Sequence, residues 1–116
     1  MAAPASDLSG IVHTGRSVWV VDYVTNLLYK LDPVTGRVLR TLNAPATETY
    51  GLAWDGRTLW ASDYDTDRIY QLDPVSGTII KDFATPGPCP DGLTWDGRTL
   101  WLTDWGTGLI YELEVT

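Results

Sequence analysis

The clearest chemical candidates in this sequence are aspartates that follow a strand-like segment in each of three related stretches. Residues 63–67 read Asp-Tyr-Asp-Thr-Asp, and such alternating carboxylates are typical of the start of a calcium-binding loop. The later glycine and the closing glutamate of that loop are lacking, so the calcium-loop motif fails. Only the first aspartate of this loop repeats, as Asp22, Asp63 and Asp104. We expect these three to accept hydrogen bonds from loop amides, with a ring of carboxylates that holds a divalent cation as the functional alternative.

His13 is the only histidine of the chain, and an imidazole could act as a general base. It occupies the position that Trp54 and Trp95 hold in the other two stretches, so packing is its expected role. General-base catalysis needs an orienting group within reach, and no second histidine accompanies His13 in the chain.

The elements that must position these residues come from a repeat of 41 residues, whose copies open at Gly10, Gly51 and Gly92 without insertion or deletion. The central copy predicts four strands, at residues 51–55, 58–63, 68–73 and 78–83. Asp55-Gly56 is a hairpin signal, and Pro74 to Gly77 is a second turn. Apolar side chains on both faces of the strands predict sheets covered on both sides. Four antiparallel strands in each period of about forty residues indicate a β-propeller blade.

The two ends of the chain fall at different points of the repeat. Residues 1–9 align with residues 42–50, so we expect them to be the return loop of a preceding blade. The last copy stops at Thr116, before the equivalent of its fourth strand. We therefore predict that residues 1–116 form one three-blade fragment whose last blade lacks its outer strand. Because a propeller closes with about four to eight blades, two copies placed head to tail would form a closed six-bladed homodimer.

Composition limits the classes of partner and location. A formal net charge of −7 argues against nucleic acid or an anionic membrane surface as a partner, since both are bound through basic patches. No apolar run is long enough to span a membrane. The single cysteine, Cys89, cannot form an internal disulfide and fits a reducing compartment, so we expect a cytoplasmic location.

A ligand site is expected at one mouth of the channel of the propeller. The loop between the second and third strands and the return loop open on the same face of a blade. That face would carry Tyr23, Tyr64 and Trp105, with Tyr50 and Asp91 leading into the innermost strands. Aromatic rings beside carboxylates suit a glycan, a cation or another small polar molecule, although rings that simply cap the blades are the alternative. We include His13 as a sixth candidate ligand residue.

The repeated pattern, GLAWDGRTLWASDYDTDRIYQLDP in the central copy, resembles the blades of the streptogramin-lyase-like, NHL and YVTN propellers. Residues 23–26 even read Tyr-Val-Thr-Asn. The resemblance covers essentially the whole chain and implies a propeller fold. These propellers include lyases, cyclotransferases, lactonases and modules that only bind proteins or glycans. The lyase branch implies a magnesium-dependent enzyme with a catalytic histidine, for which this chain offers only His13.

We therefore predict an all-β half-propeller that acts as a scaffold or binding module without identifiable catalysis. The close match of GLAWDGRTLW to GLTWDGRTLW fits recent duplication or deliberate repetition, so a natural fragment or an engineered chain is the expected origin. The alternative is a lyase or hydrolase of the streptogramin-lyase or lactonase type, active in the closed ring with a divalent ion in its channel.

Overall fold

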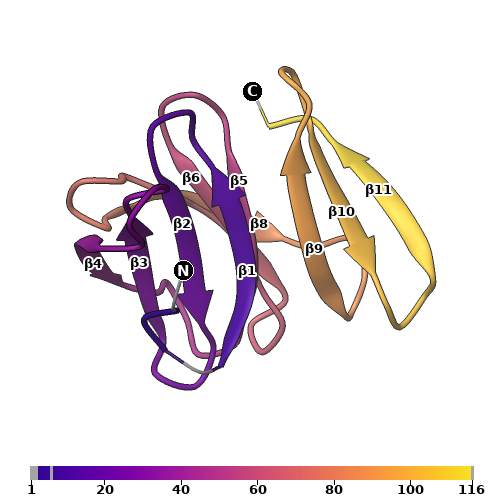
Figure 1. Cartoon of the computed structure of the whole chain (residues 1–116). Coiled ribbons are helices and arrows are strands. Elements are labelled where there is room, and N and C mark those ends of the chain that lie inside the picture. The colour runs from indigo at the N-terminus through magenta and orange to yellow at the C-terminus, as the bar shows by residue number, and fades with distance from the viewer. Residues whose placement is uncertain (1–2, 6, 116) are drawn as a thin grey trace.

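The computed structural model describes residues 3–5 and 7–115, which form three antiparallel β-sheets (Figure 1). The strands are β1 (Leu8–His13), β2 (Val18–Asp22), β3 (Leu27–Leu31) and β4 (Val38–Asn43) in blade 1; β5 (Thr49–Trp54), β6 (Leu59–Asp63), β7 (Arg68–Leu72) and β8 (Ile79–Ala84) in blade 2; and β9 (Pro90–Trp95), β10 (Leu100–Asp104) and β11 (Leu109–Leu113) in blade 3. Within each sheet the strands follow one another in chain order. The prediction of four-stranded antiparallel blades, with a last blade of three strands among the described residues, is confirmed.

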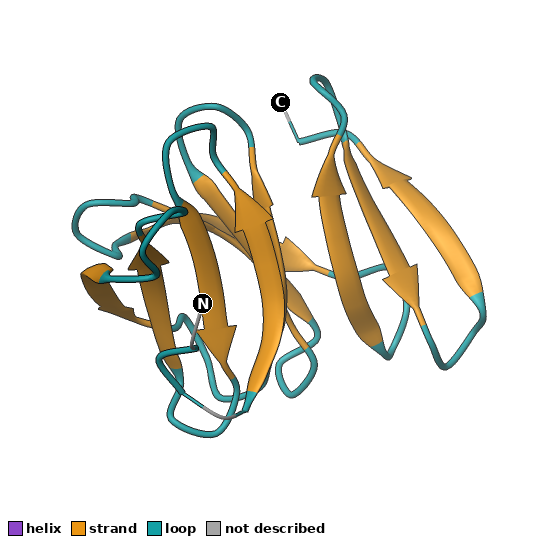
Figure 2. Cartoon of the chain, viewed as in Figure 1, coloured by secondary structure: helices purple, strands orange, loops and turns teal. Residues whose placement is uncertain are grey.

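Figure 2 shows only strands and loops in the described part of the chain. No helix long and apolar enough to cross a membrane occurs among these residues. The expected cytoplasmic location stays a prediction. Of the return loop expected at residues 1–9, residues 1, 2 and 6 lie outside the described part, and Ala3 and Pro4 lie beside the sheet of blade 1.

The hairpin turn between the first two strands of blades 2 and 3 follows from its Asp-Gly sequence. In blade 2 the Asp55 carboxylate accepts hydrogen bonds from the backbone amides of Arg57 at 2.8 Å and Thr58 at 2.7 Å. Gly56 has a φ of 98°, in the left-handed region that glycine adopts without a steric penalty. The side chain at the start of the turn therefore fixes its shape.

The glycine that opens each repeat allows the innermost strands to approach one another. β1 contacts β5, and β5 contacts β9. A Cβ atom on Gly10 would collide with the backbone carbonyl of Tyr50, and one on Gly51 would collide with the carbonyl of Asp91. No larger residue fits at these two positions without moving the neighbouring strand.

The hydrophobic core lies between the blades. Trp19 and Leu28 of blade 1 pack with Leu52, Leu59 and other residues of blade 2, and blade 2 packs against blade 3 in the same way. Buried side chains concentrate in the second and third strands of blade 1, the first three strands of blade 2 and the second strand of blade 3. The outer strands differ from the sequence-based expectation, because Ile79 and Ile80 of β8 are exposed. Blades radiate from a common axis, so neighbouring sheets lie further apart at their outer edges.

A cation on each outer strand links neighbouring blades. The Nη1 atom of Arg40 on β4 donates to the carbonyl of Pro74 in blade 2 at 3.2 Å. The Nζ atom of Lys81 on β8 donates to the carbonyl of Val115 at 2.6 Å. Both the donors and the acceptors are 41 residues apart, so this contact repeats with the blades.

The two terminal blades each leave one apolar face open. On blade 1 this front face carries Ile11, which is 71% exposed, whereas the equivalent Leu52 of blade 2 is 3% exposed. On blade 3 the back face carries Ile110, which is 69% exposed, whereas the equivalent Ile69 is fully buried. The same sequence positions are therefore core residues where a blade follows or precedes, and surface residues where none does.

Candidate functional site

Four aromatic rings form a continuous row across the three blades. The ring centroids of Tyr23 and Tyr50 lie 5.4 Å apart, and those of Tyr50 and Tyr64 lie 6.1 Å apart. Tyr64 and Trp105 stack at 5.7 Å with an interplanar angle of 14°. These separations are those of interacting aromatic pairs. The structure thus brings together four of the residues that the sequence placed at the channel mouth, and we call them the aromatic row.

The backbone places three of these rings by one repeated contact. Tyr23, Tyr64 and Trp105 each open the loop after the second strand of a blade. Their amides donate to the carbonyls of Asp7, Glu48 and Cys89, which precede the innermost strands. In Figure 1 the β2–β3 and β10–β11 loops lie at the lower edge of the molecule, where β1 and β9 begin.

Tyr50 and Asp91 stand between these loops because the innermost strands are irregular there. Thr49 pairs with Asp63 and Gly51 with Ser62, so Tyr50 is left out of the ladder as a bulge. In blade 3 the register shifts in the same place, across Asp91. A bulge redirects a side chain away from its regular position in the sheet. Tyr50 thereby lies between Tyr23 and Tyr64, and Asp91 joins Tyr64 and Trp105 in lining one hollow.

The hollow beside the aromatic row has a volume of about 410 Å³ and is lined by Tyr50, Tyr64, Asp91 and Trp105. A second hollow of about 190 Å³ follows the innermost strands and shares Tyr50 and Asp91 with the first. The first volume lies within the range of small-molecule sites, roughly 300–1,000 Å³. The exposed Asp91 carboxylate supplies an acceptor beside the rings.

Glu48 is a site residue that the sequence did not reveal. The Tyr50 hydroxyl donates to its Oε2 atom at 2.9 Å. This hydrogen bond, together with desolvation, raises the pKa of Tyr50 to about 12, so the phenol keeps its proton. Asp7 and Cys89 take the equivalent places in the other blades, so the repeat gives no signal for a glutamate here.

The repeated aspartates Asp22, Asp63 and Asp104 are buried. They hold in place the loops after β2, β6 and β10, which carry three rings of the aromatic row and are called the mouth loops. In each aspartate, the Oδ1 atom accepts hydrogen bonds from the amides two and three residues later in the loop. The Oδ2 atom accepts from the amide of Asp7, Glu48 or Cys89, just before the innermost strand. For Asp22, the bond from Thr25 is the largest of several that lower the pKa of the carboxyl. For Asp104, burial opposes ionisation, but bonds from Cys89 and Thr107 outweigh it and lower the pKa.

Each of these aspartates serves a different blade, with its oxygens directed at backbone amides. Within residues 3–5 and 7–115, no group of three His, Cys, Asp or Glu side chains could hold a metal ion. A divalent cation at Asp22, Asp63 and Asp104 therefore stays a prediction without a ligand cluster in the single chain.

His13 lies apart from the aromatic row. It ends β1 and pairs with Val18, whereas Leu8 at the start of the strand pairs with Asp22 beside the mouth loop. The Nδ1 atom of His13 accepts a hydrogen bond from the amide of Gly15 at 3.0 Å. The structure thus places His13 at the opposite end of the innermost strand from the other candidate ligand residues.

No family model matches the chain, and no curated protein matches it. Among solved structures, a catalytically inactive variant of virginiamycin B lyase from Staphylococcus aureus, determined with quinupristin, is 20% identical with a TM-score of 0.77. That match covers 100% of this chain and 40% of the lyase. Myxococcus xanthus glutaminyl cyclase is 13% identical with a TM-score of 0.77, covering 97% of this chain and 57% of the cyclase. A nidogen/laminin complex is 22% identical with a TM-score of 0.73, covering 88% of this chain and 41% of that one.

This chain therefore spans less than two thirds of the length of these structures. At these identities the likenesses show the β-propeller fold and nothing more specific. The streptogramin-lyase-like, NHL or YVTN type of its repeat stays a prediction.

Proposed function

We propose that this chain is a binding module, in which two copies close a six-bladed propeller and hold a small polar molecule or glycan at the aromatic mouth. The observation that carries this proposal is the aromatic row, whose four rings come from three blades, each ring contacting the next. Rings that only capped their own blades would contact residues of the same blade, whereas Tyr23 contacts Tyr50 and Tyr64 contacts Trp105 across a blade boundary.

The chemistry of the mouth suits the apolar faces and hydroxyl edges of a sugar. Trp105 is 61% exposed although it stacks on Tyr64, so much of its ring is open to a ligand. The Asp91 carboxylate and the Tyr50–Glu48 pair provide polar groups beside the rings. Stacking on an aromatic face combined with a few directed hydrogen bonds gives affinity and orientation to such a ligand.

The open terminal faces support closure by a second copy. The front face of blade 1 and the back face of blade 3 match the two surfaces that already pack together twice within the chain. Exposed apolar patches of this kind mark interaction surfaces. In a head-to-tail pair, each front face meets the back face of the other copy, and both junctions are buried in one closed ring.

Ring closure would also complete the mouth. The row ends at Trp105 on one side and at Tyr23 on the other. In the closed ring Trp105 of each copy lies beside blade 1 of the other copy, so two rows of four aromatic rings surround one channel entrance. The binding site of the proposed module therefore belongs to the pair of chains.

Binding is tested on an array of neutral oligosaccharides, followed by isothermal titration with the best-bound glycan. We expect Trp105→Ala to weaken binding at least about fivefold, because stacking on an aromatic side chain contributes about 1–3 kcal/mol where it has been measured on planar ligands. Val34→Ala is the matched control, since this exposed residue lies in the turn between β3 and β4, away from the mouth. Glycan binding that is equally strong in the Trp105→Ala variant would contradict the proposed site.

The lyase or hydrolase alternative needs an imidazole beside a cation in the channel. His13 lies at the far end of β1 from the mouth hollow, with its Nδ1 atom engaged by Gly15. The aromatic row therefore favours binding as the function to test first.

A further inference from the structure

We propose that His13 of one copy fits between Asp96 and Glu112 of the other, and that this contact selects the head-to-tail pairing of the two chains. The inference rests on the proposed ring, and it names the residues by which one end of the chain recognises the other. It follows from comparing the two blade junctions inside the chain with the one that a second copy would form.

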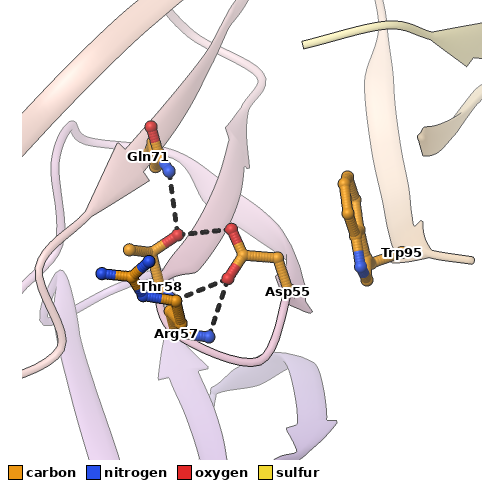
Figure 3. Close-up of a pocket in the computed structure, with 5 residues that line it drawn as sticks. All are labelled: Asp55, Arg57, Thr58, Gln71 and Trp95. Atoms are coloured by element: carbon orange, nitrogen blue, oxygen red, sulfur yellow. Dashed lines mark hydrogen bonds between the residues drawn. The ribbon is translucent and has the colours of Figure 1, made fainter. Parts of the chain in front are cut away.

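The junction between blades 2 and 3 shows what such a contact looks like. Figure 3 shows Trp95 of blade 3 across a hollow from Asp55, Arg57, Thr58 and Gln71 of blade 2. The Gln71 amide donates to the Thr58 hydroxyl at 2.9 Å, and that hydroxyl donates to Asp55 at 2.6 Å. A tryptophan on one blade thus faces a row of hydrogen-bonded polar side chains on the preceding blade.

The junction between blades 1 and 2 uses the same positions with different side chains. Trp54 of blade 2 lines a hollow with Thr14, Ser17 and Lys30 of blade 1. Lys30 takes the place of Gln71, and Thr14 takes the place of Asp55. This junction therefore carries a cation and no carboxylate at the two compared positions.

The third set of positions lies on the open back face of blade 3. Asp96, Thr99 and Glu112 stand there, 41 residues after Asp55, Thr58 and Gln71. The Thr99 hydroxyl lies 2.9 Å from Asp96 Oδ2 and 3.2 Å from Glu112 Oε2. Because it carries a single proton, it can donate to only one of these two carboxylates at a time. This is the only one of the three sets in which both ends are carboxylates.

The residue that would meet this pair is His13. It occupies the position of Trp54 and Trp95 on blade 1, and in the single chain it is exposed. Blade 1, which has no tryptophan at this position, would thus meet blade 3 of the other copy, whose compared positions carry the two carboxylates Asp96 and Glu112. An imidazole that gains a proton complements two carboxylates, whereas an indole carries no charge to do so.

The charged groups around His13 in this junction come from both copies. Asp96, Arg98 and Glu112 would face it from the other chain, and Arg16 lies in its own hairpin turn. The two arginines repeat in every blade, as Arg16, Arg57 and Arg98, so they do not distinguish this junction. The Trp101 indole donates to Asp96 at 2.7 Å, and this bond is the largest of several that hold the pKa of Asp96 far below its usual range.

The contact makes pairing depend on pH in a known direction. If the protonated imidazole is the form that the carboxylates bind, Nδ1 exchanges the bond that it accepts from the Gly15 amide for a bond that it donates to a carboxylate. The dimer then takes up protons when it forms, and lower pH favours it. A carboxyl group with the ordinary pKa of about 4 is ionised at pH 5.5, whereas the ordinary pKa of an imidazole is about 6.5. The stabilisation is present at pH 5.5 and is lost as the pH rises through the titration of the bound imidazole.

The dissociation constant of the 116-residue chain is measured by analytical ultracentrifugation at pH 5.5 and pH 7.5, at equal ionic strength. We expect pairing to be about tenfold tighter or more at pH 5.5, since a change of one pKa unit at either junction corresponds to a factor of ten. His13→Trp restores the side chain of the other blades and should pair with less than a threefold difference between the two pH values. Glu112→Gln, which copies Gln71 on an exposed residue, should reduce the difference without affecting the fold.

The two proposals fail by different results. A native chain that pairs equally at both pH values, or a His13→Trp variant with the same pH dependence as the native chain, overturns the His13 contact and leaves the ring standing. A native chain that is monomeric at both pH values overturns the ring and the contact together. Should His13→Trp not fold, Glu112→Gln decides alone, and an unchanged pH dependence in it overturns the contact.

Discussion

Trp60→Ala is expected to lower the free energy of unfolding by about 3–5 kcal/mol, the range found for removal of a large aromatic side chain from a core. Trp60 is 2% exposed between blades 2 and 3, with Phe83 at 6.2 Å between ring centroids. Its indole also donates to Asp55 at 2.9 Å, at the turn that joins β5 and β6. The substitution leaves a cavity at a blade junction and removes a partner from a half-buried carboxylate. Urea unfolding followed by circular dichroism measures the loss.

Trp105→Ala is the matched control, because it removes the same side chain from an exposed position. It loses only the stacking with Tyr64, which corresponds to roughly 1 kcal/mol. Equal losses in the two variants would show that the blade junctions do not carry the stability of the chain.

Gly51→Ala is expected to destabilise the chain by about 3 kcal/mol, at the upper end of the cost of overpacking. The added Cβ would meet the backbone carbonyl of Asp91 and lie 2.6 Å from Ser62 Oγ. The Asp91 carbonyl belongs to the main chain of β9 and accepts a hydrogen bond from Ser62 Oγ at 2.8 Å, so relieving the collision requires β5 and β9 to separate. The expected result is a lower urea midpoint for the variant than for the native chain.

Gly92→Ala is the control at the equivalent position of blade 3. Within the single chain its Cβ meets only Thr103 Oγ1, at 2.9 Å, a hydroxyl at the end of a side chain that can rotate. In the proposed ring, the repeat places Gly92 against the carbonyl of Ser9 in the second copy. The variant should therefore keep the circular dichroism of the folded blades while losing the ability to pair. A Gly92→Ala chain as unstable as Gly51→Ala when both are monomeric would contradict the close-approach argument.

The fold was predictable from the sequence because the repeat is regular. Gly10, Gly51 and Gly92 fixed the period, and turn residues such as Asp55-Gly56 divided each period into short strands. The strand starts at Leu8, Thr49 and Pro90 lie two residues before these glycines. The repeat showed that a glycine is present there, whereas only the structure shows that the neighbouring strand's carbonyl leaves no room for a side chain.

The candidate site was predictable in part. Its ring-bearing loops follow from the strand order, and the loop amides that bind Asp22, Asp63 and Asp104 follow from the turn preference of aspartate. The bulge that places Tyr50 between two loops depends on pairing register, which the sequence does not display. The Tyr50–Glu48 contact joins residues on one irregular strand start, and no repeated pattern marks it.

The position of His13 is a second feature of the candidate site that could be predicted only in part. Alignment with Trp54 and Trp95 predicted a packed position for His13, but in the single chain His13 is exposed, at the opposite end of the strand from the mouth. The predicted place of His13 among the mouth residues rested on the chemistry of imidazole, whereas the direction of β1 puts it at the far end of the strand. The strand runs away from the mouth, so each residue after Leu8 lies roughly 3.3 Å further from it.

The molar mass of the 116-residue chain in solution tests the two-copy ring most directly. Light scattering coupled to size-exclusion chromatography, at micromolar concentration and pH 6, should give twice 12.8 kDa for the native chain and 12.8 kDa for Gly92→Ala. A native chain that elutes at 12.8 kDa under these conditions, with its blades folded, would contradict the closed six-bladed ring.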